Sequence, residues 1–131
     1  MLGFIPHTIE GGGTLPIEMQ PAAAITPKIG LALAFSGGKL AICGATAVPE
    51  YICMTESDSA LEAGTMIPVI RVNHRVVFSV PATAAMTSVA LGSKVTLHTD
   101  GLQVTATTAS GVAEIVGREG TAAGDAQYIR F

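Results

Sequence analysis

Apolar and polar residues follow the two-residue period of β-strands along much of the chain after residue 28. Segments 31–35 and 40–43 flank the turn Ser36-Gly37-Gly38-Lys39. A two-residue Gly-Gly loop is typical of a tight hairpin, because both loop positions take positive φ. The predicted register pairs Phe35 with Leu40, Leu33 with Ile42, Ala34 with Ala41, and Ala32 with Cys43. One face of this hairpin is large and apolar, and the small face predicts close packing against another sheet or subunit.

A second hairpin is predicted around Asp100-Gly101, a preferred type I′ pair, with strands at 94–99 and 102–106. The predicted register pairs Leu97 with Val104, Val95 with Ala106, Thr96 with Thr105, and His98 with Gln103. Apolar and polar pairs then lie on opposite faces, as in a half-buried antiparallel sheet. Ser110-Gly111 would turn the chain into a third strand, Val112–Val116, and form a meander. That meander pairs Ala106 with Ile115 and Thr107 with Glu114.

Other segments rich in β-forming residues complete the prediction. The additional strands are Glu50–Met54, Met66–Val72, Arg75–Val80 and Gln127–Phe131, with a turn at Asn73-His74. Only Ser57–Ala63 carries helix signals, with a capping residue at its start and Gly64 at its end. We therefore expect a mostly β fold, a compact antiparallel barrel or sandwich with at most one short helix.

Residues 1–27 differ from this pattern because they contain four prolines and the triplet Gly11-Gly12-Gly13. Prolines cannot donate to a strand ladder, yet the segment is also rich in apolar residues. We expect an extended N-terminal arm at 1–27 that lies on a partner, followed by a β domain at 28–131 that folds without residues 1–20. The alternative is that the segment forms one or two edge strands of the same domain. The candidate partner contacts are Leu15, Ile17 and Met19.

The amino-acid composition argues against several classes of protein. Charged residues make up only 13% of the 131 residues and hydrophobic residues 49%, which excludes a disordered chain and favours a surface partly covered by other proteins. The net charge of −3 and the absence of Trp argue against nucleic-acid binding. The longest uncharged stretch, 76–93, is broken by Pro, Gly, Ser and Thr, so no membrane span is expected. The first residues lack the features of a signal peptide, and we expect assembly in a cytoplasm.

The sequence contains no recognisable set of catalytic residues. The two cysteines, Cys43 and Cys53, lie in apolar surroundings without metal-ligand spacing, and we expect buried thiols, with a disulfide between neighbouring strands left open. The isolated histidines and the acidic cluster both indicate solvated surface; they are His7, His74, His98, Glu56, Asp58 and Glu62. The sequence therefore predicts no catalytic, metal or cofactor site, and it indicates a structural or binding protein rather than an enzyme.

The order of elements from residue 28 to 131 resembles the capsid cement, or head decoration, proteins of tailed bacteriophages. The segments that carry the resemblance are Gly30–Phe35 with its Gly-Gly-Lys-Leu turn, Tyr51–Glu56, Ala63–Val69, Leu91–Val95, Asp100-Gly101 and Val112–Gly117. The resemblance implies a small non-enzymatic virion protein that binds the major capsid protein on the outside of a completed shell, often as a trimer. It carries over no catalytic residue, and the segment 1–27 is longer than the family's pattern.

Two functions from different classes follow. The first is a structural virion protein that stabilises junctions between major capsid subunits, with a tail or baseplate location as a variant of the same class. The second is a small β-barrel module that binds a ligand or carbohydrate. A large pocket lined by convergent polar groups would favour the second function.

Overall fold

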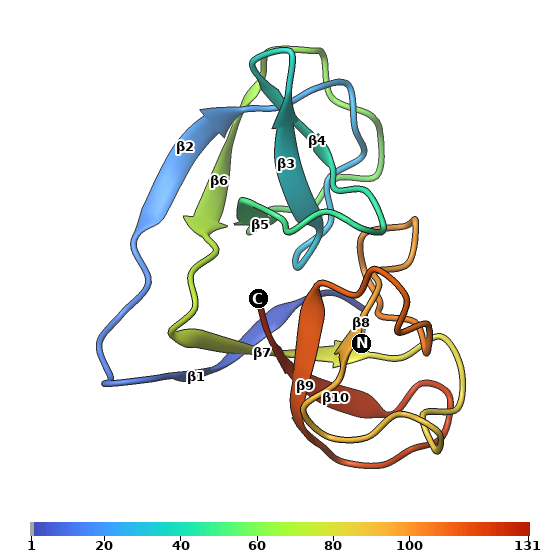
Figure 1. Cartoon of the computed structure of the whole chain (residues 1–131). Helices are drawn as coiled ribbons and strands as arrows, with labels where there is room; N and C mark the ends of the chain where they lie inside the picture. The colour runs from blue at the N-terminus through green and yellow to red at the C-terminus, as the bar shows by residue number, and fades with distance from the viewer. Residues whose placement is uncertain (1) are drawn as a thin grey trace.

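The computed structural model describes residues 2–131, which form two antiparallel five-stranded sheets (Figure 1). Sheet A has the strand order β1 (Ile5–Ile9), β7 (Val76–Pro81), β10 (Ala126–Arg130), β9 (Ala113–Arg118), β8 (Lys94–Val95). Sheet B has the order β2 (Ile17–Pro21), β6 (Met66–Arg71), β5 (Tyr51–Cys53), β3 (Ala32–Ser36), β4 (Lys39–Ile42). The expectation of a mostly β fold is confirmed, and the described residues form no helix.

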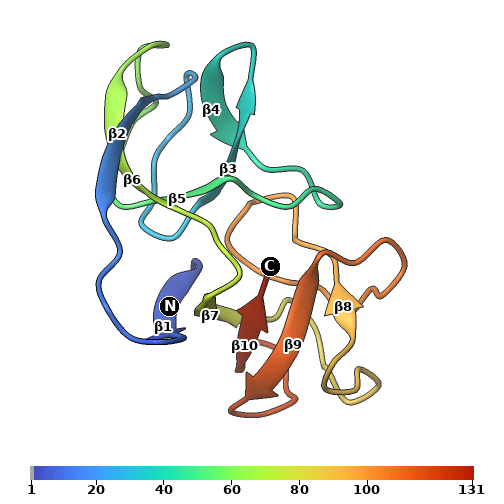
Figure 2. The same ribbon diagram turned by 60° about the vertical axis from the view of Figure 1, so that its left-hand side comes forward.

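Between β1 and β10 the chain passes from one sheet to the other twice. The segment between β1 and β2 leads from sheet A to sheet B, and the predicted turn at Asn73-His74 leads back from β6 to β7 (Figures 1 and 2). Isolated β-bridges bring each sheet near to a closed barrel. In sheet B, Ala22 bridges Leu40; in sheet A, Val104 bridges both Ala82 and Leu97. Neither sheet is closed by a continuous ladder, so the sandwich alternative describes the fold.

Alternating side chains of sheet B divide between two buried clusters. Ala32, Ile52 and Ile70 join one cluster with residues of sheet A, which fills the space between the sheets. The second cluster lies on the other face of sheet B; it includes Leu31, Leu33, Leu40, Tyr51, Cys53, Ile67, Val69 and Leu102. The two-residue strand period therefore buries some side chains on each face of sheet B.

The Gly37-Gly38 hairpin has the predicted register. Leu33 pairs with Ile42, Ala34 with Ala41, and Phe35 with Leu40. On the small face, Ala32 and Cys43 are buried in the cluster shared with sheet A. The close packing that the small residues predict is therefore made against the second sheet of the same chain.

The register of the Asp100-Gly101 hairpin is confirmed at its centre, but the predicted type I′ turn and the predicted meander are wrong. Asp100 does not take positive φ, and the turn is closed instead by a hydrogen bond from the Gly101 N–H to the His98 carbonyl. Leu97 bridges Val104, and the hydroxyls of Thr96 and Thr105 lie 2.7 Å apart. Strand β9 pairs with β8 and β10 instead of with 104–107. The backbone explains this, because Val95 accepts a hydrogen bond from Val112 on one side of the strand while Thr96 donates to Thr107 on the other. The 94–97 segment thus lies between β9 on one side and residues 104–107 on the other.

The helix expected at Ser57–Ala63 does not form. The Ser57 hydroxyl donates to the carbonyl of Ser59 and accepts from its N–H, a local turn that competes with helical hydrogen bonds. The Leu61 N–H donates to the carbonyl of Ile25. A seven-residue segment gains too little from helix propagation to overcome these contacts.

Residues 2–27 take the edge-strand alternative in the structure of this chain. β1 pairs with β7 of sheet A and β2 pairs with β6 of sheet B. Phe4 is fully buried, and its ring lies 6.5 Å from that of Phe78 and 5.5 Å from that of Phe131. Folding of residues 28–131 without residues 1–20 stays a prediction, and so does a contact of the N-terminal segment with a partner.

Candidate functional site

Exposed apolar side chains gather on one face of β2 and β6. Ile17, Met19 and Met66 expose 56%, 53% and 52% of their surface. They share a face because Ile17 pairs with Ile70, Met19 with half-buried Pro68, and Pro21 with Met66. We call Ile17, Met19, Met66 and Pro68 the β2–β6 patch. Isolated exposed apolar residues are ordinary, but neighbouring ones on two paired strands are typical of a contact surface.

The three residues predicted to contact a partner differ in their exposure in the structure. Ile17 and Met19 belong to the patch, whereas Leu15 is half-buried and packs against the cluster between the sheets. Sequence reasoning missed Met66, because only the register between β2 and β6 brings it beside Pro21. The β-forming residues of Met66–Val72 predict a strand, but they do not show that residues 17–21 form the strand beside it.

The opposite face of β2 carries a polar network. The Arg71 guanidinium donates to both Glu18 carboxylate oxygens at 3.1 Å, and its carbon lies 5.1 Å from the centre of the Tyr51 ring. The Tyr51 hydroxyl donates to Glu18 at 3.3 Å, and the Gln20 amide donates to the Tyr51 hydroxyl at 3.3 Å. These bonds, with Arg71 first, hold the pKa of Glu18 below its usual value. β2 therefore separates a charged face from an apolar one.

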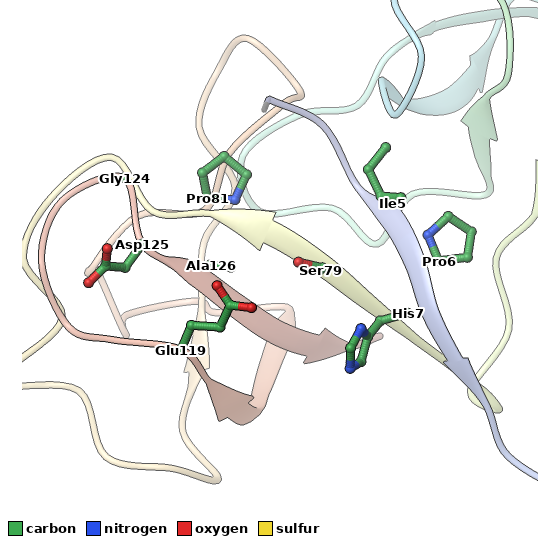
Figure 3. Close-up of a pocket in the computed structure, with 9 residues that line it drawn as sticks. All are labelled: Ile5, Pro6, His7, Ser79, Pro81, Glu119, Gly124, Asp125 and Ala126. Carbon is green, nitrogen blue, oxygen red and sulfur yellow. The ribbon is translucent and has the colours of Figure 1, made fainter.

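A pocket of about 410 Å³ opens beside β1 and β7 (Figure 3). His7 and Ser79 come from these neighbouring strands, while Glu119 and Asp125 flank the connection between β9 and β10. The remaining lining residues are Ile5, Pro6, Pro81, Gly124 and Ala126. The pocket thus combines an imidazole, a hydroxyl and two carboxylates over an apolar wall.

Contacts of the pocket residues fix part of this arrangement. The His7 ring stacks on the ring of Tyr128 with centres 4.2 Å apart. The Tyr128 hydroxyl donates to Glu119 at 2.9 Å, which raises the pKa of Tyr128. Asp125 accepts a hydrogen bond from the Ala122 N–H at 3.0 Å. His7 is therefore not isolated as the sequence suggests, since its partner lies at the other end of the chain.

The remaining titratable candidates lie apart from this pocket. Glu56 and Asp58 are exposed in the loop after β5, and His74 Nδ1 lies 3.0 Å from the carbonyl oxygen of Phe131. His98 Nδ1 lies 3.1 Å from an Asp100 carboxylate oxygen in the second hairpin. Within residues 2–131, no group of three or more His, Cys, Asp or Glu side chains is arranged to hold a metal ion.

Cys43 and Cys53 are both free and buried, as expected from their apolar surroundings. The Cys43 thiol donates to the carbonyl of Ala47 at 3.2 Å, and that of Cys53 to Thr55 at 3.3 Å. Burial, with a smaller contribution from the charge of Glu50, raises the pKa of Cys43 to about 11. Burial likewise raises the pKa of Cys53. Neither thiol is activated as a nucleophile.

The fold and these surfaces define a small all-β protein with an apolar patch along one sheet edge and a pocket at the other sheet. In comparisons with known proteins, no family model matches the chain and no curated protein is found to be similar to it. No helix in the part of the chain that the structure describes is long and apolar enough to cross a membrane.

Proposed function

We propose that the protein is a structural virion protein that binds the outer surface of an assembled phage capsid and stabilises junctions between major capsid subunits. The observation that carries this proposal is the β2–β6 patch, where Ile17, Met19 and Met66 are each more than half exposed. A chain with only 13% charged residues that also exposes such a patch is suited to a partly covered surface. The resemblance in the order of elements supplies the kind of partner.

Binding at a junction would strengthen a shell by mass action. A protein that binds the assembled shell better than free subunits lowers the free energy of the assembled state, by an amount that grows with the logarithm of its concentration above the dissociation constant. Apolar side chains on paired strands suit this role, because the strands are already ordered and little backbone freedom is lost on docking. A tail or baseplate location is an outcome that the experiment distinguishes.

Co-sedimentation with empty shells of the major capsid protein from the same phage tests the proposal. We expect the chain to pellet with intact shells, and Met66→Ser to weaken its attachment about tenfold or more by removing an apolar contact. Leu91→Ser is the matched control, since Leu91 is 61% exposed but lies outside the patch. Failure to bind shells, or imaging of the chain only on tails, would overturn the capsid role.

The pocket beside β1 and β7 favours a second candidate, a module that binds a small ligand or carbohydrate. Its polar groups come from β1, β7 and the β9–β10 connection, and a ligand pocket likewise combines a few polar groups with an apolar lining. Titration of a carbohydrate library with His7→Ala as the control tests this function. Saturable binding that the variant loses would support it, and its absence leaves the first candidate.

A further inference from the structure

Two methionine side chains make up much of the exposed surface of the β2–β6 patch. Met19 and Met66 expose 53% and 52% of their surface. Met19 pairs with Pro68 and Met66 with Pro21, so the two methionines are diagonal neighbours on one face of the sheet. Diagonal neighbours in an antiparallel pair lie about 7–8 Å apart, within reach of long side chains. The patch therefore presents two neighbouring thioethers to solvent.

The other sulfur-containing side chains in residues 2–131 are better shielded. Met86 is fully buried in the cluster between the sheets, and Met54 is half-buried against that cluster. Cys43 and Cys53 are buried thiols, and burial raises the pKa of both, which disfavours the reactive thiolate form. An oxidant in solution therefore reaches the two thioethers of the patch more readily than any other sulfur in this part of the chain.

From this arrangement we infer that Met19 and Met66 form an oxidation site that converts the β2–β6 patch from an apolar to a polar surface. The oxidant is a peroxide. The thioether sulfur attacks one oxygen of hydrogen peroxide, the O–O bond breaks, and hydroxide leaves with the bonding electron pair. The proton of the sulfur-bound hydroxyl then passes to that hydroxide, so each reaction yields one methionine sulfoxide and one water.

The neighbours of each methionine decide what the sulfoxide does to the surface. Its oxygen is a hydrogen-bond acceptor, and burying a polar group without a hydrogen bond costs free energy. The residue opposite each methionine is a proline, Pro68 or Pro21, which offers neither an N–H nor a side-chain donor. A partner that packs apolar side chains on the patch therefore loses affinity when the methionines are oxidised.

The fold is expected to tolerate the modification. Met19 and Met66 are each more than half exposed, and neither belongs to a buried cluster. Oxidation of Met86, in contrast, would place a polar group in the core between the sheets. The modification site is a property of this chain alone, whereas its effect on attachment rests on the proposed capsid function.

Mass spectrometry of peptides after exposure of the full chain to dilute hydrogen peroxide tests the site. We expect Met19 and Met66 to be oxidised at least about tenfold faster than Met86 in the native chain, because oxidation follows exposure, and the difference to vanish in urea. Native oxidation rates at Met19 and Met66 that do not exceed the rate at Met86 would overturn the inference.

Hydrophobic interaction chromatography measures the change in the surface without any partner. The oxidised chain should elute earlier than the untreated chain and keep its circular dichroism spectrum. The double variant Met19→Leu, Met66→Leu is the matched control, because leucine keeps the apolar volume of methionine but forms no sulfoxide. The double variant retains every other methionine, so a shift as large as that of the parent chain would assign the change to another residue and overturn the inference.

Co-sedimentation with shells tests the consequence for attachment. Oxidation should weaken binding of the parent chain about tenfold or more and leave binding of the double variant unchanged. Methionine sulfoxide reductases with a dithiol should restore binding, since the dithiol becomes a disulfide while the sulfoxide returns to a thioether and releases water. Unchanged binding after oxidation of both methionines would overturn the effect on attachment. If the untreated chain does not bind shells, the capsid proposal fails, and the oxidation rates and the elution still decide the modification site.

Discussion

Phe4→Ala is the substitution that best distinguishes a detachable N-terminal arm from an integral edge segment. Phe4 is fully buried and packs against the rings of Phe78 and Phe131. Loss of its transfer free energy costs about 2–3 kcal/mol. Loss of two aromatic contacts adds about 0.5–1.5 kcal/mol each, so the total is about 3–6 kcal/mol, close to the roughly 3–5 kcal/mol typical of buried Phe→Ala changes.

For a domain of this length, that destabilisation corresponds to a fall in melting temperature of about 10–20 °C. Thermal unfolding followed by circular dichroism measures it. Phe35→Ala is the matched control, since the same atoms are removed from a ring that is 39% exposed, and its effect should be less than half as large. If Phe4→Ala lowers the melting temperature no more than the control does, the N-terminal segment does not belong to the core, and our reasoning about it fails.

Three further outcomes follow from particular contacts. Gly30→Ala should destabilise the chain by about 2–4 kcal/mol in urea unfolding, because Gly30 has φ +89° and an added Cβ would lie 2.7 Å from the Gly3 Cα. Asp100→Asn should flatten the loss of stability below about pH 4: burial opposes ionisation, but hydrogen bonds led by the Leu102 N–H outweigh it and lower the pKa of Asp100. The unfolded chain then takes up this proton first as pH falls, so a variant that keeps the wild-type slope contradicts the assignment. Cys43 should react with a disulfide reagent at pH 8 more than about 100-fold slower in the native chain than in the unfolded chain, and rapid native labelling would contradict its burial.

Local turn chemistry explains why some of the fold was predictable. Gly37-Gly38 both take positive φ and fix which residues oppose each other within a few positions, so the pair Phe35–Leu40 followed directly. The pair Leu97–Val104 was also predicted, although the turn before it is closed at His98 and Gly101 and not by the expected type I′ geometry. The partner of β9 was not predictable in this way. Strand choice there depends on which side of the 94–97 segment is already hydrogen-bonded, and that is set by the tertiary structure.

The N-terminal segment shows how composition can mislead. Its prolines and glycines favour an extended path, and the structure contains one, but that path follows the edges of both sheets. Pro6 and Pro21 are compatible with this because edge strands tolerate a missing N–H. The candidate contacts Ile17 and Met19 were found from their apolar character alone. The pocket was not found, because His7 and Tyr128 are close only in the folded chain.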